Sequence, residues 1–275
     1  MSIAATSCLF LFAWEWGEKD PVFDVRLLFK RTYLLSILGM MMIAGVFLGT
    51  NQLIPQFTQQ ALGYTATNAG LAMTFSGVAT LVLMPVAGRF ISFVQAKYMM
   101  MAGLASEAIA LFGFTHLNSD VSWGWVALTR TGLAIGIPFM FIGINTAAYA
   151  EIPGDKTAQA SAQLNLARNL GASLVISLAQ VVLEQRQQFH QSRLVETLAQ
   201  GDPGYRNWTA AVTSALTGHG SRAPLAGLGQ IYDGVIQQAQ IMAYGDVFWA
   251  LAVAAATLTP FFMFMKKIKP GAPQA

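Results

Sequence analysis

The segment YLLSILGMMMIAGVFLGTNQLIPQF, from Tyr33 to Phe57, decides the fold class, because no charged side chain interrupts it. An α-helix needs about 20 predominantly apolar residues to cross the roughly 30 Å hydrocarbon core of a bilayer, and this segment is long enough. Five further stretches are similarly apolar: Gly70 to Phe93, Tyr98 to Leu117, Val126 to Tyr149, Leu170 to Leu183 and Val247 to Met265. The fifth of the six reaches full length only if the more polar turn at 165–167 joins it. The chain is therefore predicted to be an all-α membrane protein with a six-helix transmembrane bundle.

The composition agrees with a chain that lies mostly in lipid, since 55% of its residues are hydrophobic, 11% are charged, and the mean hydropathy is +0.50. The net charge of +3 could indicate a nucleic-acid partner. The basic residues lie at the ends of apolar stretches, however, where they flank a membrane, so no nucleic acid is expected. The single cysteine, Cys8, has no internal disulfide partner and no metal-ligand spacing around it, so no metal site is predicted.

The distribution of lysine and arginine predicts the orientation. Four basic groups fall on one side of the membrane if the spans alternate: Arg26, Lys30 and Arg31; Arg89 and Lys97; Lys156 and Arg168; and Lys266, Lys267 and Lys269. The short opposite loops, residues 58–69 and 118–122, contain no lysine or arginine. By the positive-inside rule, the basic side and the C-terminus are expected to be cytoplasmic.

The apolar stretches divide the chain into six segments. Residues 1–16 are apolar and contain Trp14 and Trp16, so they resemble the last part of a membrane helix more than a signal peptide. The expected segments are that partial transmembrane helix at 1–16, a cytoplasmic linker at 17–32, the first five bundle helices at 33–183, an extracytoplasmic loop with helical segments at 184–246, the last transmembrane helix at 247–265 and a cytoplasmic tail at 266–275.

The outer loop is expected to contain two helical stretches. Residues 184–200 should continue the fifth helix past the membrane surface, and residues 225–242 should form a second helix that leads into the last span. A cap folded on the protein's own outer face and a docking surface for a partner protein both fit this pattern.

Small residues indicate that the membrane helices pack closely. Gly45 and Gly49 in the first stretch, and Gly132 and Gly136 in the fourth, have the G-x-x-x-G spacing that brings helix backbones together in lipid. This favours a packed bundle over a set of separate membrane anchors.

Polar groups within the apolar stretches are the candidate substrate path, because each is unfavourable in lipid unless it faces protein or water. Spacings of three and four residues place one series on a single face of the fifth helix. The candidates are Asn51, Gln52 and Gln56 in the first stretch, Asn145 in the fourth, and Asn169, Ser173, Ser177 and Gln180 in the fifth. Each alone could be an interhelical hydrogen bond, whereas the set favours a hydrated path through the bundle.

Glu107 is the most informative single residue, because a carboxylate near the middle of the third stretch is unfavourable without a partner. Arg130 lies about two turns from the outer end of the adjoining antiparallel stretch, at nearly the same depth given a rise of ~1.5 Å per residue. An ion pair between the two is therefore feasible. It would either fix helix packing or provide a carboxylate whose proton affinity changes during transport.

Five segments together resemble one known family. They are PVFDVRLLFKRTY (Pro21 to Tyr33), IPQFTQQALGYTATNAGL (Ile54 to Leu71), PVAGR (Pro85 to Arg89), EIPGDKTAQASAQLNLARNLGASL (Glu151 to Leu174) and QAQIMAYGDVFW (Gln238 to Trp249). This combination is similar to the C-terminal half of a major facilitator superfamily multidrug efflux permease, of the drug:proton antiporter branch with 14 spans. Residues 1–16 would then end the second of two extra central helices, and the six full stretches would form the second six-helix domain.

The resemblance implies proton-driven export of amphipathic drugs or toxic compounds by alternating access across a bacterial cytoplasmic (inner) membrane, with the proton gradient as energy source and no cofactor. It also implies a cytoplasmic gating loop at Gly88, Arg89 and Lys97. Here the chain departs from the family motif, because Ser92 and Phe93 follow Gly88 where an acid and a base are expected.

The expected partners are the lipid bilayer and small amphipathic substrates. The resemblance further implies a complementary N-terminal half-transporter, with a dimer of the chain as the alternative, and a periplasmic adaptor protein. A metabolite transporter of the same fold and an accessory membrane protein acting through its outer loop are the alternatives. An enzyme is not expected, since the sequence contains no H-E-x-x-H motif and no phosphate-binding glycine loop.

Overall fold

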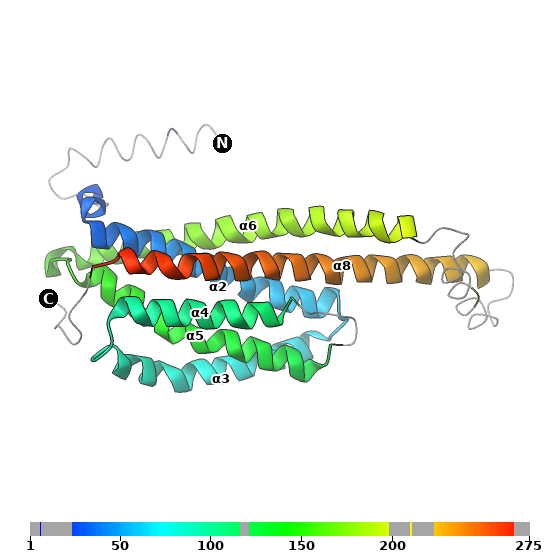
Figure 1. Cartoon of the computed structure of the whole chain (residues 1–275), viewed down its shortest axis with the longest axis horizontal. Coiled ribbons are helices and arrows are strands. Elements are labelled where there is room, and N and C mark those ends of the chain that lie inside the picture. Colours follow the sequence, from blue (N-terminus) through cyan, green and yellow to red (C-terminus); the bar gives the residue numbers. More distant parts are fainter. Residues whose placement is uncertain (1–5, 7–23, 116–120, 198–209, 211–222, 267–275) are drawn as a thin grey trace.

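The structure is a computed structural model that describes residues 6, 24–115, 121–197, 210 and 223–266. Its elements are the 3-10 helix η1 (Val25–Phe29), α2 (Arg31–Gln60), α3 (Ala66–Phe90), α4 (Ala96–Gly113), α5 (Trp123–Tyr149), the 3-10 helix η2 (Gly154–Lys156), α6 (Thr157–Thr197), α8 (Ala223–Leu258) and the 3-10 helix η4 (Thr259–Phe264). Six long helices run side by side, and no strand occurs among the described residues (Figure 1). The predicted all-α bundle is confirmed, while the predicted partial helix at 1–16 lies outside the described residues.

Five of the helices, α2, α3, α5, α6 and α8, are long and apolar enough to cross a membrane. The sixth, α4, has 18 residues and carries two charged side chains, Lys97 and Glu107. It packs against α5 and α8, so neighbouring helices shield the charge at Glu107 from lipid. In contrast, α3 and α6 are the least buried of the five membrane-length helices. Only 17% and 28% of the residues in their most apolar stretches are buried. These two helices therefore have the largest surfaces that remain open to lipid or to another protein.

Close backbone contacts hold the helices together. A Cβ built on Gly45 would lie 2.5 Å from Val175 of α6, and one built on Gly171 would overlap the backbone of Met41 in α2. Gly136 of α5 likewise faces the backbone of Gly103 in α4. The predicted G-x-x-x-G glycines therefore lie at helix interfaces, where the missing side chain lets two backbones approach.

Hydroxyl side chains define the start of two helices. The Thr65 hydroxyl accepts a hydrogen bond from the Asn68 amide at the start of α3, and the Ser122 hydroxyl accepts one from the Trp125 amide at the start of α5. Each cap satisfies a backbone N–H that has no partner within its helix.

Two helices extend beyond the rest of the bundle at one end, called the outer end below (Figure 1). The 41 residues of α6 correspond to about 60 Å at ~1.5 Å per residue, well beyond the ~30 Å of hydrocarbon. Helix α8 has 36 residues and meets the outer end of α2 through a hydrogen bond from the Gln237 amide to the Ala61 carbonyl. Residues 184–197 thus continue α6, and residues 223–246 lead into the last span within α8, as the sequence pattern predicts.

Candidate functional site

Amide side chains from two helices meet at the outer end of the bundle. The Gln180 side-chain amide of α6 donates to the side-chain Oε1 of Gln56 in α2 at 2.8 Å, and the Gln56 Nε2 donates to the Gln60 Oε1 at 3.4 Å. The Tyr244 hydroxyl of α8 reaches the same Gln60 oxygen at 3.4 Å. Five glutamines, which we call the amide cluster, line a hollow of about 460 Å³: Gln52, Gln56, Gln59, Gln60 and Gln180. The cluster offers hydrogen-bond donors and acceptors without any formal charge.

The other predicted polar residues of α6 lie on the exposed side of that helix. Asn169, Ser173 and Ser177 are exposed, and the Ser173 hydroxyl donates to the Asn169 carbonyl one turn before it. Because their spacing is four residues and Gln180 follows three residues later, this strip leads along the helix to the amide cluster. A parallel strip of exposed leucines, Leu166, Leu170, Leu174 and Leu178, lies beside it on the same helix. One face of α6 therefore presents a polar track bordered by apolar side chains.

Asn145 is a predicted path residue that does not line the amide cluster. It is half-buried, and its amide donates to the Phe141 carbonyl of its own helix at 2.7 Å. Within the described structure Asn145 forms no hydrogen bond to α2 or α6.

Glu107 and Arg130 are both buried, with 1% and 4% of their surfaces exposed. Their charges are close enough to interact. The direct ion pair considered from their depths is nevertheless not formed, since no ion pair within 4.0 Å joins them. The Arg130 Nη2 donates instead to the Asn51 Oδ1 of α2 at 2.5 Å. Helix depth alone does not determine the contact, because a guanidinium on α5 can reach a neighbour on either side.

Three buried polar atoms at this place have no hydrogen-bond partner among the described residues: Glu107 Oε2, Arg130 Nε and Arg130 Nη1. Buried polar groups are normally paired, and leaving one unpaired costs on the order of 1–3 kcal/mol. Arg130 and Glu107 therefore keep unused hydrogen-bonding capacity beside the Arg130–Asn51 contact.

The predicted gating residues lie at the turn between α3 and α4. Gly88 and Arg89 are exposed in the last turn of α3, and Lys97 lies in the first turns of α4 with its ammonium 5.1 Å from the Tyr98 ring centroid. Neither Arg89 nor Lys97 takes part in an ion pair with a described residue. Their part in gating stays a prediction.

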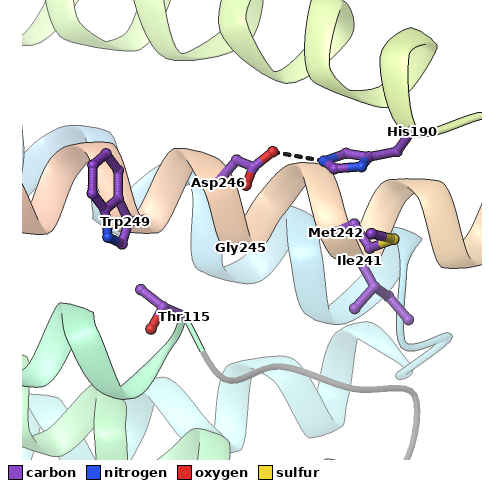
Figure 2. Close-up of a pocket in the computed structure, with 7 residues that line it drawn as sticks. All are labelled: Thr115, His190, Ile241, Met242, Gly245, Asp246 and Trp249. Carbon is purple, nitrogen blue, oxygen red and sulfur yellow. Dashed lines mark hydrogen bonds and ion pairs between the residues drawn. The ribbon is translucent and has the colours of Figure 1, made fainter. Parts of the chain in front are cut away.

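A second pocket at the outer end contains charged residues that sequence reasoning did not select. Figure 2 shows Asp246 of α8 pointing toward His190 of α6, and both residues line a pocket of about 360 Å³. The Asp246 Oδ2 lies 2.6 Å from both the His190 Nε2 and the Arg186 Nε. These contacts fasten α6 to α8 where both leave the bundle. The sequence contained a signal for this site: Asp246 directly precedes the last span, and Arg186 and His190 lie one helical turn apart.

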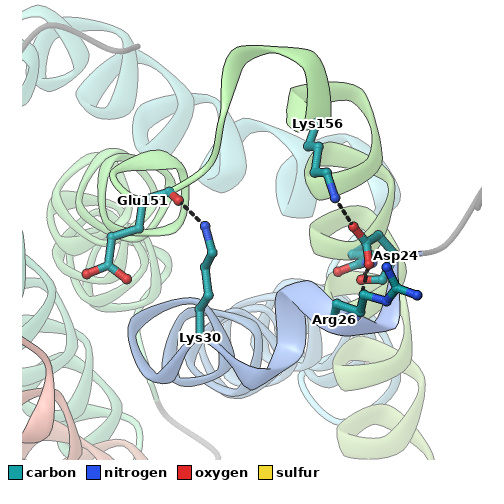
Figure 3. A network of polar contacts seen from close by, with 6 residues as sticks. Asp24, Arg26, Lys30, Glu151 and Lys156 are labelled. Carbon is teal, nitrogen blue, oxygen red and sulfur yellow. Dashed lines mark hydrogen bonds and ion pairs between the residues drawn. The ribbon is translucent and has the colours of Figure 1, made fainter. Parts of the chain in front are cut away.

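A polar network at the opposite, inner end was also missed (Figure 3). Asp24 is 2% exposed and pairs with Lys156 at 2.5 Å, and its second oxygen accepts from the Arg26 amide at 3.0 Å. Lys30 donates to the Glu151 carbonyl at 2.6 Å. The predicted linker before the first span is therefore bound to the α5–α6 connection, and two segments that carry the family resemblance contact each other.

This network predicts a stability that is lost in acid. Burial alone would raise the pKa of Asp24, but the Lys156 ammonium and the Arg26 N–H stabilise the carboxylate and hold its pKa below the usual value. A carboxyl with a lowered pKa stabilises the fold above the unfolded pKa of ~3.9, and the contribution is lost as pH falls through the lower folded value. In thermal unfolding of the purified protein, Asp24→Asn should remove about 1–3 kcal/mol at neutral pH.

The control for this prediction is Asp155→Asn, an exposed acid in the same connection. At each pH between neutral and about pH 4, its melting temperature should equal that of the unsubstituted protein. Equal destabilisation by the two substitutions would contradict the role assigned to Asp24.

Comparison with known proteins relates this helical bundle to a family of transporters. The model of the family described as Major Facilitator Superfamily matches residues 10–176. The fatty acid resistance protein FarB of Neisseria gonorrhoeae is 26% identical over 97% of this chain and 52% of its own length. The multidrug export protein EmrB of Escherichia coli strain K12 is 24% identical over 96% of this chain and 51% of its own, and the probable multidrug resistance protein EmrY of the same strain is 23% identical over 96% and 51%.

The chain thus spans about half the length of the curated relatives it matches. The matches confirm the resemblance to multidrug efflux permeases, and with the five membrane-length helices they make this a multi-pass protein of the bacterial inner membrane. On the family match and its extent, the chain belongs to the Major Facilitator Superfamily.

Proposed function

We propose that the chain is the second half of a proton-coupled exporter of amphipathic drugs or toxic compounds that works by alternating access. The observation that carries this proposal is the amide cluster, which joins α2, α6 and α8 and continues along α6 as a polar track. A site of this kind can pair the polar end of an amphipathic molecule while neighbouring apolar side chains contact the rest of it. The names of the relatives, which refer to multidrug export and fatty acid resistance, support the same class of cargo.

The exposed faces of α3 and α6 support the need for a complementary half. Gly70, Gly77 and Gly88 of α3 are seven and eleven residues apart, close to whole numbers of helical turns, so they share one face. A Cβ on any of the three would meet nothing within 4 Å. Small residues in lipid mark places where another helix packs closely. An N-terminal half-transporter, of the length by which the relatives exceed this chain, fits this face.

The proposed orientation places the inner-end network and the C-terminus in the cytoplasm, by the positive-inside rule. The outer end, where α6 and α8 extend beyond the bundle, then faces the periplasm. A periplasmic adaptor protein is the proposed partner of these extensions, and the proton gradient is the proposed energy source.

The proposal is tested in a bacterial strain that lacks its own drug pumps. The chain is co-expressed there with the first half of a multidrug relative, and efflux of ethidium is followed by fluorescence. Gln56→Leu and Gln180→Leu should each slow efflux about tenfold, because each leaves a polar partner unpaired in the path. Gln188→Leu, an exposed amide beyond the cluster on α6, is the matched control and should leave efflux unchanged.

Two outcomes would count against the proposal. Unchanged efflux in both cluster variants would remove the amide cluster from the path. Full resistance from the lone chain would show that no complementary half is needed.

A further inference from the structure

We infer that Asn51 is a positioning residue that links the amide cluster to Glu107, by holding Arg130 in one of two alternative positions. This inference rests on the proposed function, since it describes how cargo in the path and a proton on Glu107 exclude each other. The inference rests on the position of Arg130: it lies on α5, between the Asn51 amide on α2 and the Glu107 carboxyl on α4.

In the observed arrangement, a neutral amide holds the buried guanidinium. The Arg130 Nη2 lies 2.5 Å from the Asn51 Oδ1, while Arg130 Nε and Nη1 and the Glu107 Oε2 have no partner. Hydrogen bonds between ionised groups are roughly twice as strong as those between neutral groups. An ionised Glu107 would therefore compete with Asn51 for Arg130, whereas a protonated, neutral Glu107 would not.

The helices that pack against α4 carry no other charge near Glu107, and the charges of α2 and α3, Arg31 and Arg89, lie at the inner ends of those helices. Arg130 is the only charged residue of α5, which spans 123–149. Helices α8 and η4 carry no charged residue between Asp246 and Lys266. Lys97 on α4 itself lies ten residues before Glu107, about 15 Å along the helix. Tyr244 and His190 lie at the outer end with Asp246. The ionisation of Glu107 is thus governed by burial and by the position of Arg130.

Asn51 directly precedes Gln52 of the amide cluster, and Gln56 follows five residues later on the same helix. A cargo molecule that accepts or donates a hydrogen bond at the Asn51 amide would release Arg130 from it. The guanidinium then turns to Glu107, the O–H bond of the carboxyl breaks, and the proton leaves to water in the path. By linkage, protonation of Glu107 weakens cargo binding by the same factor, which is the coupling that an antiporter requires.

The test follows the protonation of Glu107 without any transport step. The whole chain is placed in lipid nanodiscs, and the infrared carbonyl band of protonated carboxyl groups is recorded between about pH 4 and 9, with Glu107→Gln identifying the band. In Asn51→Leu, Arg130 loses its amide partner and moves to Glu107, so the band should disappear at a pH about one unit or more below that of the unsubstituted protein. In Asn51→Asp, a carboxylate retains Arg130, and the band should persist to a higher pH.

Asn145→Leu is the matched control, because among the described residues the Asn145 amide bonds only within its own helix, and it should leave the titration in place. Shifts of opposite sign in the two Asn51 variants are not expected from a loss of packing. Superimposable titrations of Asn51→Leu and the unsubstituted protein, equal shifts in Asn145→Leu, or the absence of a Glu107 band at every pH would each overturn the inference. If the shifts occur but ethidium efflux does not depend on the amide cluster, the proposed function fails and the positioning role stands.

Discussion

A leucine at Gly171 is expected to prevent the bundle from assembling. A Cβ at this position would overlap the carbonyl oxygen, carbonyl carbon and Cα of Met41, all of which are backbone atoms of α2. Overpacking against movable side chains typically costs about 1–3 kcal/mol, and a backbone contact has less freedom to relax. The fraction of monodisperse protein in size-exclusion chromatography of a fluorescent fusion should fall about tenfold or more.

Gly77→Leu on α3 is the matched control, since its Cβ would meet nothing within 4 Å. The lone chain should fold as well with this substitution as without it. When the first half of a multidrug relative is co-expressed, however, Gly77→Leu should reduce ethidium efflux, because the proposed partner helix packs on this face. Normal folding of Gly171→Leu would contradict the close approach of α2 and α6, and full efflux with Gly77→Leu would contradict the proposed docking face.

The fold could be predicted from the sequence to the extent that it depends on hydropathy. The segment from Tyr33 to Phe57 lies within α2, as its apolar length predicts. The fifth span was harder to delimit, because Asn165 and Arg168 interrupt its apolar run. In the structure the Asn165 amide donates to the Ser161 carbonyl and accepts from Arg168, so these polar side chains are satisfied and α6 begins at Thr157.

The candidate site was predictable where it depends on helical periodicity and not where it depends on the choice of neighbour. The three- and four-residue spacing identified Gln180, and the structure joins it to Gln56. For Arg130, the contact with Asn51 was not predicted, because rise per residue says nothing about which adjacent helix a side chain meets. The Asp24–Lys156 and Asp246–His190 contacts join residues that lie 132 and 56 positions apart, a separation at which single-sequence patterns carry no pairing information.

Removal of Arg130 is expected to lower both the stability of the bundle and its efflux activity. Substitutions at Glu107 show which part of this loss comes from the charge on Glu107. At a pH where Glu107 is ionised, Arg130→Leu leaves a buried carboxylate with no cation near it, which is expected to cost about 3–5 kcal/mol of stability and to abolish ethidium efflux. Glu107→Gln keeps the side-chain shape and the contact of Arg130 with Asn51, so stability should change little. Its efflux should no longer respond to an imposed pH gradient, because the side chain has lost its titratable group.

The double variant Glu107→Leu, Arg130→Leu separates stability from function. Replacing two buried charges by apolar side chains of similar volume is often neutral or stabilising, so the melting temperature should return close to that of the unsubstituted protein while efflux stays absent. If the double variant is as unstable as Arg130→Leu alone, Arg130 stabilises the bundle through Asn51 rather than through the charge on Glu107. Restored efflux in the double variant would show instead that proton exchange occurs elsewhere, since neither a titratable group nor its cation would then remain between α4 and α5.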